Sequence, residues 1–154
     1  MKKSKLQNEK VYIAFDIQPL SYNSKNKTNY EKKLQLIFTS QYSHLYSFLP
    51  FSDSIESRIA LYHREQNFKN VVDIDNISKP IIDSFVGLIY SDDKQVIQRV
   101  AMRYDLQPME MIAIDCTEMP YAVEQDVTSF MSNKSNHLVV CSFRRISRSD
   151  IMGA

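Results

Sequence analysis

Apolar and polar residues alternate along the first regular segment of the chain. In residues 11–18, large apolar side chains occupy the odd-numbered positions, and small or polar ones occupy most of the others. This period of two predicts a half-buried strand that ends at Pro19. From about Tyr30 to Phe48 the apolar residues recur instead at helical spacing, and Pro50 closes this predicted helical region.

A second helical pattern follows a predicted strand at residues 57–63. Its apolar residues recur at intervals of three and four and form one stripe. They are Ile77, Ile81, Phe85 and Leu88. Because Pro80 is tolerated best in a first helical turn, the pattern predicts a helix from Asn76 or Ile77 to Tyr90. Asp75 or Asn76 would then be its N-cap.

The remaining segments complete an α+β domain. Residues 94–103 and 110–116 are predicted to form a strand pair, residues 121–132 are ambiguous, and residues 137–143 are predicted to be a last strand. We therefore expect a single domain, a mixed sheet with two main helices packed on it. Its expected parts are a basic frayed N-terminus (1–10), the domain itself (11–146) and a C-terminal tail (147–154).

Length and composition exclude several classes of protein. The 154 residues are 44% hydrophobic, enough for one core. No apolar run approaches the roughly 18 residues of a membrane span, and the basic start lacks the apolar stretch of a signal peptide. We expect a cytoplasmic protein without membrane contact. The two cysteines, Cys116 and Cys141, are interpreted as reduced thiols that pack in the core.

Charge is distributed unevenly. Eight lysines and three acidic residues lie in residues 1–34, and residues 134–149 hold four bases and no acid. Residues 91–126 hold eight acids and three bases. Basic ends could bind a polyanion while the acids hold cations, or charged ends could simply keep a small protein soluble. Charge alone does not choose between the two.

Two acidic motifs are the candidates for chemistry: Asp73-Ile74-Asp75-Asn76 and Asp92-Asp93. In an extended segment Asp73 and Asp75 would point to the same face. Carboxylates held close together favour a cation between them, and Mg²⁺ suits such oxygen ligands. The motifs could meet within one subunit or across a dimer. Alternatively, Asp75 could be only an N-cap, and Asp92-Asp93 only a polar turn.

Two other kinds of metal site do not fit the pattern. A calcium-binding loop would require an acid or amide at Ile77 and glycine at Ser78. The three histidines lack ligand spacing, which argues against zinc. They are His44, His63 and His137.

Residues 73–96, DIDNISKPIIDSFVGLIYSDDKQV, resemble the signature of the RusA family of Holliday junction resolvases. The shared features are an Asp-x-Asp-Asn-x-x-Lys block, a helix with a further Asp, and an Asp-Asp-x-Gln-Val start to a strand. Upstream, Pro19, Ser21 and Asn23 resemble the family's loop after the first strand. A difference is the stretch 68–72, which lacks the arginine-rich run that relatives can carry before the first aspartate.

The resemblance implies a RusA-like fold and a site. Asp73, Asp75 and Asp93 match the family's metal-binding catalytic aspartates, and Lys79 matches a lysine important for activity. Asp92 matches a neighbouring acid with a supporting role and is counted with the other three as a candidate metal residue. It also implies an Mg²⁺-dependent homodimer that nicks opposed strands of four-way DNA junctions in recombination and repair. A metal-bound water would attack the phosphodiester in line, and Lys79 would offset charge on the phosphate.

Five basic residues are candidates for phosphate contacts, which would weaken steeply with salt. They are Lys25, Lys27, Lys69, Arg144 and Arg145. Asp83, two turns after Asp75, is interpreted as solvent-facing charge and left out of the catalytic set. Two other classes stay open: a non-catalytic DNA-binding protein and a structural metal-binding protein with the same fold.

Overall fold

The computed structural model of the chain describes residues 9–17, 25–64, 73–132 and 136–152. The strands are β1 (Lys10–Phe15), β2 (Ile55–His63), β3 (Val96–Asp105) and β4 (His137–Arg145). The helices are α2 (Lys27–Ile37), α3 (Ile74–Ser84), α4 (Tyr121–Met131) and α5 (Arg148–Met152), together with a π-helical turn η1 (Phe38–Tyr42) and the 3₁₀ turns η2 (Ser43–Leu45) and η4 (Asp93–Gln95).

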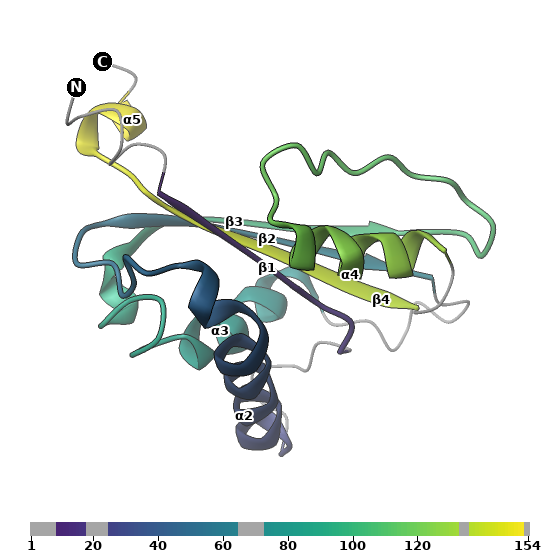
Figure 1. The fold of residues 1–154 in the computed structure, drawn as a ribbon, viewed down its shortest axis with the longest axis horizontal. Coiled ribbons are helices and arrows are strands. Elements are labelled where there is room, and N and C mark those ends of the chain that lie inside the picture. The colour runs from purple at the N-terminus through teal and green to yellow at the C-terminus, as the bar shows by residue number, and fades with distance from the viewer. Residues whose placement is uncertain (1–8, 18–24, 65–72, 133–135, 153–154) are drawn as a thin grey trace.

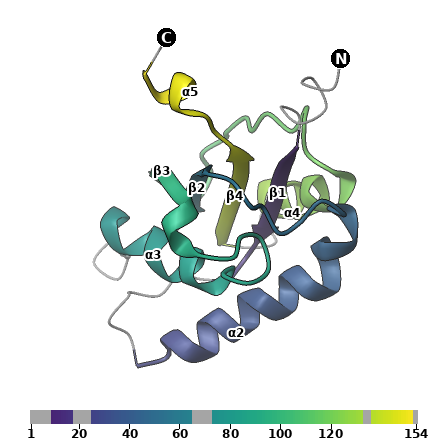
Figure 2. The same cartoon turned by 90° about the vertical axis from the view of Figure 1, so that its left-hand side faces the viewer.

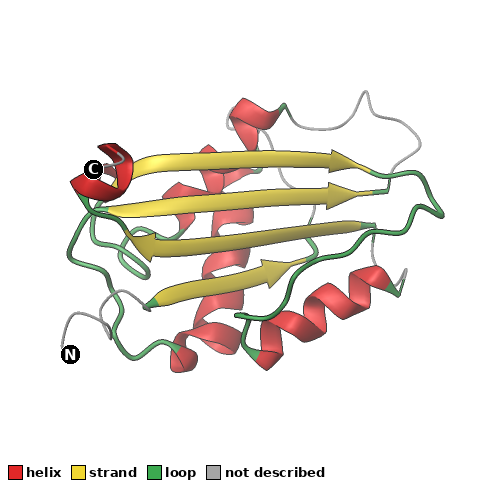
Figure 3. Cartoon of the chain, turned by 90° about the horizontal axis from the view of Figure 1, so that it is seen from above, coloured by secondary structure: helices red, strands yellow, loops and turns green. Residues whose placement is uncertain are grey.

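The four strands form one mixed sheet in the order β1-β4-β2-β3 (Figure 3). β4 pairs antiparallel with both β1 and β2, whereas β3 pairs parallel with β2. A parallel pair needs a crossover connection, and here α3 provides it. The predicted α+β fold with a mixed sheet is therefore confirmed, and both acidic motifs lie in the β2-α3-β3 unit.

α2 and α3 cover one face of the sheet, as Figures 1 and 2 show from two directions. Alternate strand residues such as Ile59, Cys141 and Phe143 point to this side and are fully buried with Leu34 of α2 and Ile77 of α3. α4 packs beside β1, which is the edge strand farthest from β3 (Figure 3). None of the described helices has the length and apolar character to cross a membrane.

The predicted strand pair after the second helix is wrong in its second member. Residues 94–103 do give a strand, β3, but residues 110–116 form none. Their apolar residues Ile112, Ile114 and Cys116 pack partly against the core without a backbone ladder. β3 takes its hydrogen-bonding partner from β2 instead. Alternating side chains define which face is buried but do not choose the neighbouring strand.

α3 begins earlier and ends earlier than predicted. It starts at Ile74, its N-cap is Asp73, and Pro80 lies inside it. Asp73 and Asp75 therefore do not share one face of an extended segment, because Asp75 lies in the first helical turn. Burial of Ile77 and Ile81 at 0% exposure stabilises this helix despite the cost of an internal proline.

The ambiguous segment 121–132 contains α4, and the predicted helix from Tyr30 to Phe48 is divided into α2, η1 and η2. α4 buries Val123, Val127 and Phe130, which lie at helical spacing. Cys141 is buried, Cys116 is partly buried, and both are free thiols.

Candidate metal centre

One face of α3 carries charged residues at intervals of four. Lys79 and Asp83 are four residues apart, and Asp75 lies four residues before Lys79, so the three positions share a helix face. The side chain of Asp75 lies outside the described part of the structure. Asp73 is exposed, and its carboxylate makes no capping hydrogen bond, although aspartate is a favoured N-cap residue. The carboxylate of the N-cap residue Asp73 thus accepts no hydrogen bond from the backbone of the helix.

The second acidic motif reaches this helix face through Lys79. The Lys79 ammonium lies 2.9 Å from an oxygen of Asp83 and 3.6 Å from an oxygen of Asp93. Lys79 and Asp93 are both partly exposed, with 35% and 44% of their side chains accessible. The second acidic motif therefore contacts the helix that begins at the first motif, within one chain.

The charges around Lys79 alternate in sign across two helices. The Lys27 ammonium of α2 lies 3.3 Å from Asp83 and 3.3 Å from Glu31. Although partial burial lowers the pKa of Lys27, its bonds to Asp83 and Glu31 raise that pKa overall. Asp83 is thus shared by Lys27 and Lys79 and connects α2 with the face that meets Asp93.

A capping box holds the turn that presents Asp93. Asp92 is the N-cap of η4, and its carboxylate accepts a hydrogen bond of 2.9 Å from the Lys94 backbone N–H. In return, Gln95 Oε1 accepts from the backbone N–H groups of Ser91 and Asp92, at 2.8 and 3.0 Å. This reciprocal arrangement satisfies the free donors at the start of a helical turn. Asp92 therefore stabilises the turn, while Asp93 is presented beside Lys79.

Asp92 and Asp93 are adjacent in the chain at the start of η4. The hydrogen bond from the Lys94 backbone N–H is the main cause that lowers the pKa of Asp92, and the neighbouring Asp93 side chain lowers it further. Two adjacent carboxyl groups can share a proton or bind a cation. Since all donors here are carboxylate oxygens and Asp93 is accessible to solvent, the residues fit a hard divalent cation such as Mg²⁺.

Among the described side chains, no group of three or more potential metal ligands is assembled. The side chain of Asp75 is not among them, so the set of three predicted aspartates is not tested as a whole. Asp73 precedes Lys79 by six residues, which corresponds to about 9 Å along a helix axis.

The candidate DNA-contacting residues lie in different environments. Lys25 is exposed, and Lys69 lies outside the described residues. Lys27 is ion-paired as given above. Arg144 lies 3.0 Å from the buried Glu56, and Arg145 lies 3.3 Å from Asp53.

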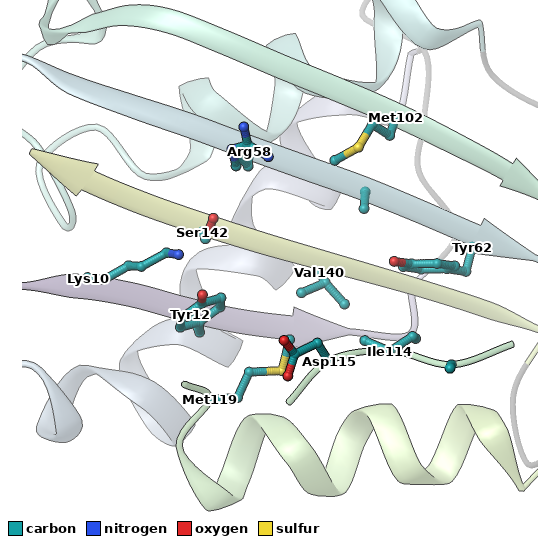
Figure 4. A pocket seen from close by; sticks show the side chains of 12 residues that line it. Lys10, Tyr12, Arg58, Tyr62, Met102, Ile114, Asp115, Met119, Val140 and Ser142 are labelled. Carbon is teal, nitrogen blue, oxygen red and sulfur yellow. The ribbon is translucent and has the colours of Figure 1, made fainter. Parts of the chain in front are cut away.

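A hollow of about 290 Å³ lies on the sheet face opposite α2 and α3. Lys10, Tyr12 and Arg58 contribute side chains from the strands, and Asp115 and Met119 approach from the segment before α4 (Figure 4). None of the predicted acidic residues lines it, so the hollow and the candidate metal centre are separate places on the molecule.

Sequence reasoning missed the roles of Asp83 and Gln95. The i, i+4 spacing of Lys79 and Asp83 is a signal for their ion pair, and the spacing of Asp92 and Gln95 is that of a capping box. The contact of Asp83 with Lys27 has no such signal, because the two residues are far apart in the chain.

Comparison with known proteins identifies the family of the chain. The model of the endodeoxyribonuclease RusA family matches residues 7–115, which include β1, β2, α3, β3 and both acidic motifs. A search of curated proteins gave no match. The family match covers more than two thirds of the 154 residues. The chain belongs to the RusA family of endodeoxyribonucleases, which act on DNA.

Proposed function

We propose that this protein is a crossover junction endodeoxyribonuclease, which resolves four-way DNA junctions by paired nicking in recombination and repair. It acts as a homodimer and depends on Mg²⁺. The observation that carries the proposal is the contact of Asp93 with Lys79, because it brings the second acidic motif against the helix that carries the first. The family match supports action on branched DNA.

Asp73, Asp75 and Asp93 are the proposed metal ligands, and Asp92 supports the site as the N-cap of the turn before Asp93. When bound, the cation would polarise the scissile phosphate and lower the pKa of a water. Asp73 is available because its carboxylate makes no capping bond, and Asp93 because it is partly exposed.

Lys79 is the proposed electrostatic contact to the phosphate. Its ammonium is held on the accessible side of α3 by Asp83, and a cation at this place stabilises negative charge that develops during phosphate hydrolysis. Asp83 orients Lys79, and Lys27 in turn holds Asp83. The proposed set of DNA contacts remains Lys25, Lys27, Lys69, Arg144 and Arg145. Because Lys25 is exposed, we expect it to be the simplest of these to test.

The test compares a labelled four-way junction with a linear duplex of the same sequence, with and without Mg²⁺. The wild-type protein should cut only the junction, at paired positions, and only with Mg²⁺. Asp93→Asn should abolish cutting and keep the circular dichroism spectrum, whereas Asp16→Asn, at an exposed position after β1, is a control with the same charge change outside the motifs. Equal cutting by Asp93→Asn and wild type would contradict the proposal.

Two further measurements separate the alternatives: a gel mobility shift with the junction, and thermal unfolding with and without Mg²⁺. A non-catalytic DNA-binding protein would slow the migration of the junction in the gel without cutting it at any Mg²⁺ concentration. A structural metal-binding protein would unfold at a higher temperature with Mg²⁺ than without it, and it would not change the mobility of the junction. Either result would replace the proposed activity.

A further inference from the structure

Both ends of the Gln95 side-chain amide are fully used. Its oxygen accepts from the backbone N–H groups of Ser91 and Asp92 within the turn. Its nitrogen donates to the backbone carbonyls of Phe51 and Asp53, at 2.8 and 3.0 Å. One side chain thereby joins the turn that carries Asp93 to a segment more than forty residues earlier in the chain.

The segment that receives the Gln95 amide is anchored in the core of the protein. Phe51 is fully buried, and its N–H donates to the Ile89 carbonyl at 2.8 Å. Phe51 also forms a parallel bridge with Tyr90. The buried Tyr90 hydroxyl in turn donates to the Ile82 carbonyl of α3 at 2.5 Å. Gln95 therefore connects the turn to the same framework that holds the Lys79 helix.

A capping box needs only one end of the Gln95 side chain. In this motif the residue three positions after the N-cap accepts from the N-cap backbone, and glutamate serves as well as glutamine. The two bonds that Gln95 Nε2 donates to Phe51 and Asp53 lie outside that motif. They fix where the whole turn lies relative to the core, and glutamate cannot donate them.

We propose that Gln95 is a positioning residue, which holds Asp93 at the distance from α3 that divalent-metal binding requires. The inference rests on the proposed function and deepens it. Asp93 itself is partly exposed, so its place depends on the turn to which it belongs. Residues that orient a metal ligand commonly change metal affinity or activity by about 10-fold to 100-fold when they are replaced.

The test replaces Gln95 by glutamate, which keeps the acceptor end and places a carboxylate against two carbonyl oxygens. Mn²⁺ affinity is measured by isothermal titration calorimetry, and junction cleavage is measured under saturating metal. Gln95→Glu should weaken Mn²⁺ binding and lower kcat by about tenfold each, with the KM for the junction within about twofold of wild type. Gln107→Glu, an exposed glutamine in the segment after β3, is the matched control.

A cycle with Asp93→Asn distinguishes positioning from a general loss of stability. If Gln95 acts through Asp93, Gln95→Glu should weaken Mn²⁺ binding no further in the Asp93→Asn background. An equal loss in both backgrounds would overturn the inference, as would wild-type affinity and kcat in Gln95→Glu. Failure of the proposed function gives a different result, because then the wild-type protein itself would show no metal-dependent cleavage, and the inference would fall with it.

Discussion

Lys79 is the residue through which the second acidic motif contacts α3. Its ammonium is shared between Asp83 of its own helix and Asp93 of the following turn. Such a cation has two opposite effects on a metal site. It competes with a divalent ion for Asp93, and it offers positive charge to a phosphate.

Replacement of Lys79 by methionine separates these effects. We expect Mn²⁺ affinity to rise by about threefold, because a competing charge near Asp93 is removed at a partly screened position. Junction cleavage should nevertheless fall by about 100-fold, because the phosphate loses its contact. Calorimetry and a cleavage assay measure the two, with Lys33→Met on the exposed side of α2 as the control. A loss of Mn²⁺ affinity in Lys79→Met would show that the sign of this interaction is wrong.

Individual residues differ in how much of their role the sequence contains. The resemblance singled out Asp93 and Lys79 together, and the structure places them in contact. Gln95 was noted only as one position of the Asp-Asp-x-Gln-Val motif. The carbonyl that its amide contacts belongs to Phe51, 44 residues earlier, and no local sequence pattern indicates that these two segments are neighbours. Lys27 remains a proposed phosphate contact, but the sequence did not show that it begins a helix and pairs with Asp83.

At the scale of elements, the chain reverses its direction after α3, and this turn determines where Asp92 and Asp93 lie. α3 ends at Ser84, and Gly87 follows with φ of 86°, a left-handed conformation that favours glycine. The Gly87 N–H donates to the Tyr90 carbonyl at 2.6 Å, which closes the turn. The sequence pattern instead extended the helix to Tyr90, because the partly buried Leu88 continues the apolar spacing beyond the helix end.

Gly87→Ala should lower the free energy of unfolding by about 1 kcal/mol, because the left-handed conformation is costly for a residue with Cβ. The added methyl group itself meets open space, with nothing within 4 Å. Gly87→Asn, which tolerates this conformation better, should lose less. Chemical denaturation measures both variants. Equal stability of Gly87→Ala and wild type would argue that Gly87 does not adopt this conformation.

α4 is attached to the rest of the fold by a polar contact with η1. The Tyr42 hydroxyl donates to the Ala14 carbonyl at 3.0 Å and also contacts the Asp126 carboxyl group. The partly buried surroundings of this contact disfavour the charged form of the Asp126 carboxyl group. Burial raises the pKa of Asp126, its bond to Tyr42 lowers it in part, and the charge of Asp16 raises it further.

The raised pKa predicts the pH dependence of stability. The stabilisation from a protonated Asp126 is complete below its unfolded value of 3.8 and is lost as pH rises through its higher folded pKa. The free energy of unfolding of Asp126→Asn, relative to wild type, should therefore rise as pH increases from the unfolded pKa of Asp126 through its higher folded pKa. Thermal unfolding measures this difference, with Glu124→Gln on the exposed side of α4 as the charge-matched control. A falling difference would mean that the pKa of Asp126 is lowered in the fold.

In the whole molecule, the candidate centre belongs to a single β2-α3-β3 unit. The sequence predicted the α+β class, the buried stripe of α3 and both acidic motifs. It did not predict that β3 would pair parallel with β2, because a strand's alternation indicates its faces and not its neighbours. That pairing, with the turn at Gly87, brings Asp93 back to α3, where it contacts Lys79. The proposed metal site requires that this approach also bring Asp93 to Asp73 and Asp75.

The most direct test of that convergence is NMR of the full chain titrated with Mn²⁺, whose unpaired electrons broaden the signals of nearby nuclei. We expect the backbone amides of Asp73, Asp75 and Asp93 to broaden together at the same low Mn²⁺ concentration, while those of β1 and α4 stay sharp. In Asp93→Asn, the three should broaden only at higher concentration. Broadening at one motif alone, or separate Mn²⁺ affinities for the two, would contradict a shared metal centre.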